Sequence, residues 1–131
     1  MAKRLLDTNI VSFLLKDHPL LARYQPHLEG HSLAVSFMTV AELYEGSYLA
    51  RWGKHRVQRM ERLLKTVSII PSNPEMCRCW GEIRSMRRSE PIDVADGWIA
   101  ATAVTFGFRL VTHNPRDFRN IAGLKIITEG S

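Results

Sequence analysis

The stretch KRLLDTNIVSFLLK, residues 3–16, sets the pattern that decides the fold of this 131-residue chain. Its start, residues 3–6, ends in the apolar pair Leu5 and Leu6 and predicts a short strand. Asp7 follows directly, and residues 9–16 carry apolar side chains at helical spacing. A strand joined so closely to a helix favours a parallel sheet, because parallel strands need crossover connections and helices usually supply them.

The same alternation continues to the end of the chain. We expect further strands at residues 33–37, 67–71, 110–112 and 125–128, and further helices at 20–28, 39–52, 54–65, 75–88 and 94–106. This order predicts an α/β fold, a three-layer sandwich with a mainly parallel central sheet flanked by helices. The length is that of one typical domain and no linker interrupts it, so we expect residues 1–131 to form a single domain.

Composition narrows the function classes. There is no run of eighteen apolar residues and no room for a signal-peptide core before Asp7, which predicts a soluble, cytoplasmic protein without membrane association. Cys77 and Cys79 are separated by a single residue and lack a second pair, a spacing that suits neither a disulfide framework nor a zinc site.

The formal net charge is +5, with basic stretches at 51–65 and 78–88. These favour either a polyanionic partner or ordinary solvated helix faces.

Four acids stand at comparable places in the predicted fold: Asp7, Glu42, Asp96 and Asp117. They follow apolar runs or begin a helix, and the carboxyl ends of parallel strands open on one edge of a sheet, so the four carboxylates could converge there. Two carboxylates about 4 Å apart repel by roughly 4 kcal/mol at an effective dielectric constant near 20. A cation or proton uptake usually offsets such a penalty, and Mg²⁺ or Mn²⁺ suits oxygen ligands.

Each acid also has an ordinary structural explanation. Asp7 is a favoured helix N-cap, and Thr39 and Glu42 have the spacing of a capping box. Asp96 would gain from the dipole of the helix that it begins, and Asp117 could be a turn acid. Taken singly these interpretations stay open. Taken together they weaken, because independent caps have no reason to collect at one edge of a sheet.

Four sequence blocks, in this order, resemble the PIN-domain ribonucleases, and most closely the VapC toxins of bacterial and archaeal toxin–antitoxin pairs. The blocks are LDTN at 6–9, TVAEL at 39–43, DGWIAATA at 96–103 and LVTHNPRDF at 110–118. They span almost the whole chain. A single block would be a weak signal, whereas the ordered set is a strong one.

The resemblance implies a metal-dependent endoribonuclease that hydrolyses RNA phosphodiester bonds. Its Mg²⁺ or Mn²⁺ would be held by Asp7, Glu42, Asp96 and Asp117. Polar neighbours of the metal ligands would be Asn9, Thr112 and Asn114. The resemblance also implies a homodimer and a cognate antitoxin that holds the enzyme inactive.

Three residues near the blocks have open roles. Asp93 departs from the family, which more often has a small or polar residue there, and we interpret it as a helix cap that adds charge to the rim. Trp98 could stack an RNA base or be a core aromatic, and His113 could act as an acid or be a turn histidine.

Two other classes compete with the nuclease hypothesis. A receiver-like domain also gathers acids at strand ends, but it needs a phosphoacceptor acid after a central strand, and residues 69–73, IIPSN, contain none. A non-catalytic RNA-binding module would explain the positive charge but not the gathered carboxylates.

Overall fold

The structure is a computed structural model that describes residues 3–130. Its centre is a five-stranded sheet in the order β3-β2-β1-β4-β5, and every neighbouring pair is parallel. The strands are β1 (Arg4–Leu6), β2 (Leu33–Ser36), β3 (Ser68–Ile70), β4 (Arg109–Val111) and β5 (Ile126–Ile127). The predicted strands are all present, within two residues of their expected ends.

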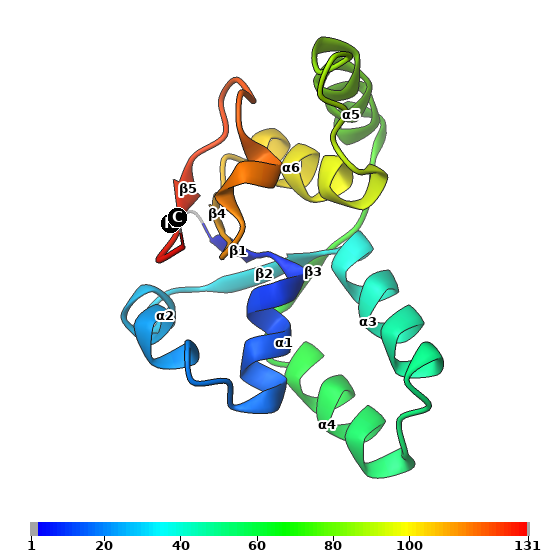
Figure 1. The fold of residues 1–131 in the computed structure, drawn as a ribbon, viewed down its shortest axis with the longest axis vertical. Coiled ribbons are helices and arrows are strands. Elements are labelled where there is room, and N and C mark those ends of the chain that lie inside the picture. The colour runs from blue at the N-terminus through cyan, green and yellow to red at the C-terminus, as the bar shows by residue number, and fades with distance from the viewer. Residues whose placement is uncertain (1–2, 131) are drawn as a thin grey trace.

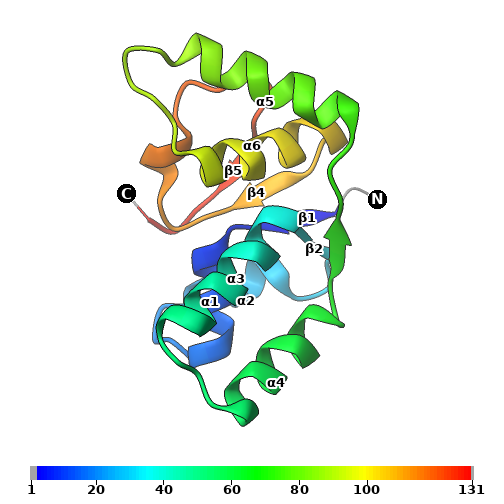
Figure 2. The same cartoon turned by 90° about the vertical axis from the view of Figure 1, so that its right-hand side faces the viewer.

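Helices cover both faces of this sheet (Figures 1 and 2). One face carries α5 (Pro74–Met86) and α6 (Val94–Phe106), and the other carries α1 (Thr8–Lys16), α2 (Leu21–Leu28), α3 (Phe37–Leu49) and α4 (Lys54–Leu64). A 3-10 turn, η1 (Pro115–Phe118), follows β4. The predicted α/β three-layer sandwich is confirmed. Within residues 3–130 no helix has both the length and the apolar character needed to cross a bilayer.

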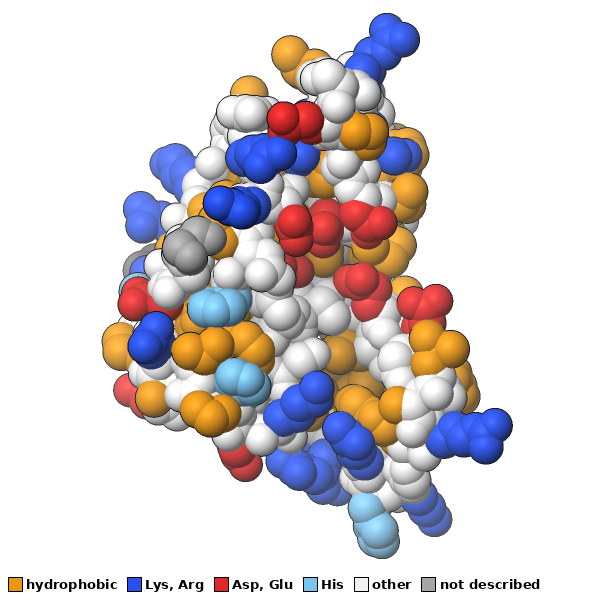
Figure 3. Space-filling view, viewed as in Figure 1, with side chains coloured by type: hydrophobic (Ala, Val, Ile, Leu, Met, Phe, Trp, Pro, Cys, Tyr) orange, Lys and Arg blue, Asp and Glu red, His pale blue; other side chains and the backbone are white. Residues whose placement is uncertain are grey.

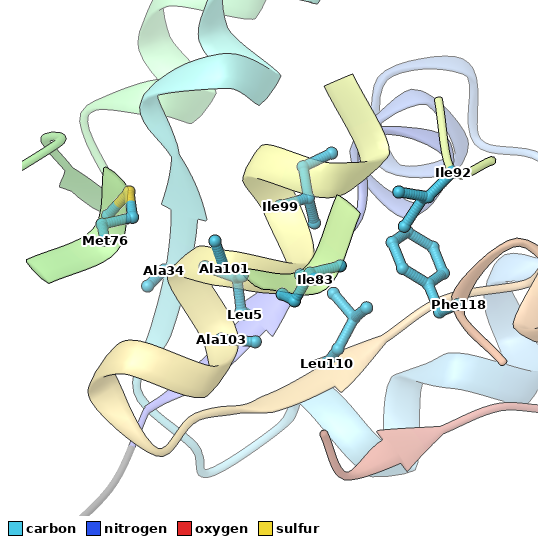
Figure 4. Close-up of a cluster of buried hydrophobic side chains, with 11 residues drawn as sticks. Leu5, Ala34, Met76, Ile83, Ile92, Ile99, Ala101, Ala103, Leu110 and Phe118 are labelled. Carbon is cyan, nitrogen blue, oxygen red and sulfur yellow. The ribbon is translucent and has the colours of Figure 1, made fainter. Parts of the chain in front are cut away.

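Successive residues of the inner strands feed two separate cores. Leu5 belongs to the cluster beneath α5 and α6 (Figure 4), whereas Leu6 belongs to the cluster shared with α1 to α4. Leu110 and Val111 divide between the clusters in the same way, and all four side chains are fully buried. Because side chains alternate across a strand, a sheet covered on both faces needs apolar residues at consecutive positions.

The start of α3 differs from the prediction. The helix begins at Phe37 and not at residue 39, and its N-cap is Ser36, whose Oγ accepts a hydrogen bond from the Met38 N–H at 3.2 Å. The capping-box interpretation of Thr39 and Glu42 is therefore wrong. The last residue of β2 itself caps the helix, which places Thr39 and Glu42 inside it and on one face.

The end of α3 is also earlier than predicted. The helix stops at Leu49 rather than at residue 52. Arg51 adopts a left-handed backbone conformation with φ of 53°, which already turns the chain before the expected break at Gly53.

Strand order creates a crevice at one end of the sheet. The chain proceeds from β1 to β2 and β3 on one side, and β4 and β5 lie on the other side of β1. The connections after β1 and β4 therefore diverge, which in open α/β sheets leaves a crevice at the carboxyl ends of those strands. Asp7 stands at this point, and its N–H donates to the Val111 carbonyl at 2.9 Å.

We expect Ser36→Ala to lower the free energy of unfolding by about 1 kcal/mol, the usual cost of a lost N-cap. The Ser36 hydroxyl is buried and also lies within hydrogen-bond distance of Thr102 Oγ1, at 3.0 Å, so no water can replace it. Urea denaturation measures the change. Ser85→Ala is the control, because that exposed hydroxyl bonds only its own helix, at Glu82 O. An equal loss of unfolding free energy in the two variants would contradict the assignment of Ser36 as the N-cap of α3.

Candidate functional site

The four predicted acids come together at the carboxyl end of the sheet. Asp7 directly follows β1, Glu42 lies in α3, Asp96 in the first turn of α6 and Asp117 in η1. Figure 3 shows acidic side chains gathered around a hollow in the middle of this face, with Lys and Arg side chains above and below it. The charges of the other three acids each raise the pKa of Asp96, which reflects their proximity.

Asp7 is the most deeply buried of these acids, with 4% of its surface exposed. Its Oδ1 accepts from the Thr8 N–H at 2.7 Å, so Asp7 is indeed the N-cap of α1. Its Oδ2 accepts from Asn9 Nδ2 at 3.0 Å and from Thr112 Oγ1 at 2.7 Å. Burial raises the pKa of Asp7 most, these three hydrogen bonds lower it, and the charge of Asp117 raises it again. The helix-cap role and the place in the acidic cluster therefore coexist.

Thr112 is oriented by its own neighbour. Its Oγ1 accepts from the Asn114 N–H at 3.0 Å, which leaves its single hydrogen for Asp7. Asn114 thus acts on the cluster through its backbone, and its residue is exposed. Thr112 is fully buried.

Glu42 is held by a pair of threonines. Its Oε1 accepts from Thr8 Oγ1 at 2.7 Å, and Thr8 Oγ1 lies 3.0 Å from Thr39 Oγ1. Since the Thr8 hydrogen points at Glu42, Thr39 must donate to Thr8. The pKa of Glu42 is raised first by burial, lowered by Thr8, and raised by the charges of Asp7 and Asp93. Sequence reasoning missed this role of Thr39, because three-residue spacing places two side chains on one helix face whether or not they cap it.

Asp96 has the most perturbed carboxyl group. Burial and the charges of Asp7, Asp117, Asp93 and Glu42 raise its pKa to about 7, in that order of size. Every one of these effects disfavours the ionised form. Asp96 therefore carries much of the electrostatic cost of gathering the acids.

Asp117 is placed by a buried arginine. Arg87 is only 9% exposed, and its Nη1 donates to the Asp117 carbonyl at 2.9 Å while its Nε donates to the Glu90 carbonyl at 3.1 Å. The Asp117 residue itself is exposed at the rim. Sequence reasoning grouped Arg87 with a basic surface stretch, and only its position beyond the end of α5 reveals that it supports η1.

Asp93 and Trp98 both make structural contacts in α6. The Asp93 carboxylate accepts from the Ala95 N–H at 3.2 Å and caps α6, while its charge adds to that of the cluster. Trp98 stacks on Trp80 with ring centroids 4.9 Å apart and meets Phe37 edge-on at 5.5 Å. These contacts make Trp98 part of an aromatic cluster between helices.

Basic side chains line α4 and its C-cap residue. Its exposed members are Lys54, Arg56, Arg59, Arg62 and Lys65. Arg56 lies over the Trp52 ring at 4.2 Å, and Arg59 donates to the Leu15 carbonyl at 3.1 Å, which joins α4 to α1. The helix thus presents a positive, solvent-exposed surface.

The donor set of the cluster suits a hard divalent cation. All four ligand candidates are carboxylates, and the raised pKa of Asp96 is the cost that a bound cation would relieve. No three acid, histidine or cysteine side chains of residues 3–130 are close enough together to ligate one ion as they stand. Mg²⁺ is compatible with such spacing, because it usually keeps several waters and takes only one or two carboxylates directly.

Comparison with known proteins gives a consistent relationship. Residues 4–124 match the PIN domain. Ribonuclease VapC1 of Haemophilus influenzae (strain R2866) is 30% identical over 125 residues, 92% of this chain and 93% of the relative. The tRNA(fMet)-specific endonuclease VapC of Shigella flexneri is 28% identical over 127 residues, 95% and 96% of the two chains. The DNA-bound VapBC crystal structure from Salmonella typhimurium superposes with a TM-score of 0.85 at 27% identity, covering 98% of each chain. The chain therefore belongs to the PIN-domain family and, within it, to the VapC ribonucleases.

Proposed function

We propose that this protein is a metal-dependent endoribonuclease and the toxin of a type II toxin–antitoxin pair. The observation that carries the metal dependence is the convergence of four carboxylates at the carboxyl end of the sheet, close enough for the charges of the other three to raise the pKa of Asp96. The similarity to VapC ribonucleases over more than nine-tenths of the chain supports RNA as the substrate.

Asp7, Asp96, Asp117 and Glu42 would hold Mg²⁺ or Mn²⁺. When bound, such an ion polarises a phosphoryl oxygen and lowers the pKa of a coordinated water. The protein itself keeps Asp7 fixed through the three donors Thr8, Asn9 and Thr112. Burial and mutual repulsion keep the site poised to bind a cation.

Only one carboxylate oxygen of Glu42 accepts a hydrogen bond from the described residues, 3–130. Its Oε1 accepts from Thr8, so Oε2 is left to accept a hydrogen bond from the attacking water and orient it toward phosphorus. The basic side chains on α4 would hold the RNA backbone. Single-stranded or looped RNA suits the hollow best, because its phosphates and unstacked bases can enter where a stiff duplex cannot.

The proposal includes the protein partners that the resemblance implies. The Salmonella neighbour is a VapBC complex, which supports a cognate antitoxin for this chain too. We further propose that the chain acts as a single domain in the cytoplasm, where RNA is available, and assembles as a homodimer.

Asp96→Asn should reduce RNA cleavage in the presence of Mg²⁺ or Mn²⁺ at least about 100-fold, since loss of a direct ligand should cost no less than loss of an outer-shell partner. Cleavage of a labelled single-stranded RNA measures it. Glu75→Gln is the matched control, because Glu75 is also a first-turn acid, in the neighbouring helix α5. Full activity of Asp96→Asn would overturn the site assignment, and a wild-type protein that binds RNA without cutting it would favour the non-catalytic RNA-binding class.

The metal-free protein should lose stability as the pH rises from about 4 to about 7 because of Asp96. Its pKa is raised from 3.8 to about 7 on folding, so the folded state keeps a proton that the unfolded chain releases in this interval. Asp96→Asn removes this dependence. In EDTA, the Tm of the variant minus that of the wild type should therefore grow from pH 4 to pH 7. A difference that stays constant would contradict the shift.

Mg²⁺ or Mn²⁺ should raise the Tm of the wild type and leave that of Asp96→Asn nearly unchanged, because only the folded wild-type site binds the ion. Thermal scans at pH 7.5 with increasing metal measure this. The buffers are free of Ca²⁺, which would compete for the site. Glu75→Gln is the control for binding to an unrelated carboxylate, and its Tm should rise with metal as that of the wild type does. Equal stabilisation of wild type and Asp96→Asn would place the ion elsewhere.

A further inference from the structure

A chain of hydrogen bonds connects the C-terminal segment to the most buried acid of the cluster. The Glu129 N–H donates to the Tyr24 hydroxyl at 3.1 Å, and that hydroxyl lies 2.5 Å from His113 Nδ1. The backbone N–H of His113 donates to Asn9 Oδ1 at 3.3 Å, and Asn9 Nδ2 donates to Asp7 Oδ2 at 3.0 Å. These residues come from four separate parts of the sequence.

The donors and acceptors in this chain have only one consistent direction. The backbone N–H of Glu129 can only donate, so the Tyr24 hydroxyl accepts there. Within residues 3–130, His113 Nδ1 is the one acceptor that the structure gives the Tyr24 hydroxyl hydrogen, so Tyr24 donates to His113. Nδ1 of His113 is therefore the acceptor in this hydrogen bond. Tyr24 is fully buried, so water cannot replace either partner.

His113 is fixed by packing as well as by this bond. The Phe13 and Tyr24 rings both meet it edge-on, each with centroids 5.7 Å away. Gly130 lies against its backbone so closely that an added Cβ would be 2.3 Å from the His113 carbonyl oxygen. The position of the His113 N–H is thus determined by residues outside the acidic cluster.

That N–H sets the orientation of Asn9. Because Asn9 Oδ1 accepts from His113, the amide nitrogen must face Asp7. A turned amide would present its oxygen to the carboxylate and repel it. The correct orientation supplies one of the three hydrogen bonds that favour the ionised form of Asp7.

We infer that Tyr24 and His113 are positioning residues, which hold Asn9 and through it Asp7 in the geometry that binds the cation. The inference rests on the proposed function, in that Asp7 is taken to be a metal ligand. Nδ1 of His113 is occupied by Tyr24 and serves as an anchor for the turn after β4.

Tyr24→Phe tests the inference, since it removes one hydroxyl and keeps the ring. Mn²⁺ titration without RNA should show about tenfold weaker binding, the lower end of the usual cost of losing an outer-shell partner. The kcat for RNA cleavage should fall by a similar factor, with KM unchanged. Tyr44→Phe is the control, because its hydroxyl donates to Glu61 at 2.6 Å and has no link to Asp7. It should match the wild type in both measurements.

His113 variants separate positioning from other roles. His113→Asn places an acceptor oxygen near the position of Nδ1 and should restore most of the Mn²⁺ affinity that His113→Ala loses. A general acid would be lost equally in both variants, so equal defects would overturn the positioning role. All measurements are made well below the Tm of each variant.

The outcomes also distinguish the two proposals. A wild-type protein that binds Mn²⁺ and cleaves RNA, together with an equally competent Tyr24→Phe variant, would overturn the positioning role alone. A wild-type protein that neither binds Mn²⁺ nor cleaves RNA would overturn the proposed function and the positioning role with it.

Discussion

The gathering of like charges at the carboxyl ends of β1 and β4 is the constraint on which the rest of the structure depends. Strand order brings Asp7 beside the segment that leads to Asp117, and helices on opposite faces of the sheet add Glu42 and Asp96. The apolar strands make this convergence rigid, because they are buried on both faces. A flexible scaffold would let the carboxylates move apart and relieve their repulsion.

The acids meet this constraint in different ways. Asp7 is almost fully buried but receives three hydrogen bonds, which partly offset the loss of solvent. Every effect on Asp96 opposes its ionisation, and together they raise its pKa to about 7. The arrangement thus combines one carboxylate that is anchored by the protein with one that responds to what enters the hollow. Arg87 contributes from outside by fixing the backbone of Asp117.

Much of this arrangement was predictable from the sequence. The apolar runs and the acids that follow them are local patterns that recur along the chain. Short apolar runs alternate with segments of helical spacing along the chain, and this alternation predicts the three-layer sandwich. The four acids occur where a predicted strand ends or a predicted helix begins. The role of Thr39 was not predictable, since its spacing from Glu42 fits a capping box and a shared helix face equally well. Nor could the link between Tyr24 and His113 be predicted, because 89 residues separate the two and no periodic pattern relates them. Burial of Arg87 was hidden by its basic neighbours.

The two outermost strands have a consequence for how other chains can associate with this protein. β3 and β5 form the edges of the sheet, and they contain three and two residues. An exposed edge invites another chain to extend the sheet only if it offers a long row of unpaired backbone groups. Edges this short give a foreign strand little to pair with, so assembly has to proceed through side chains on helices and loops. The shortness of these edge strands also protects a chain without a bound partner from edge-to-edge aggregation.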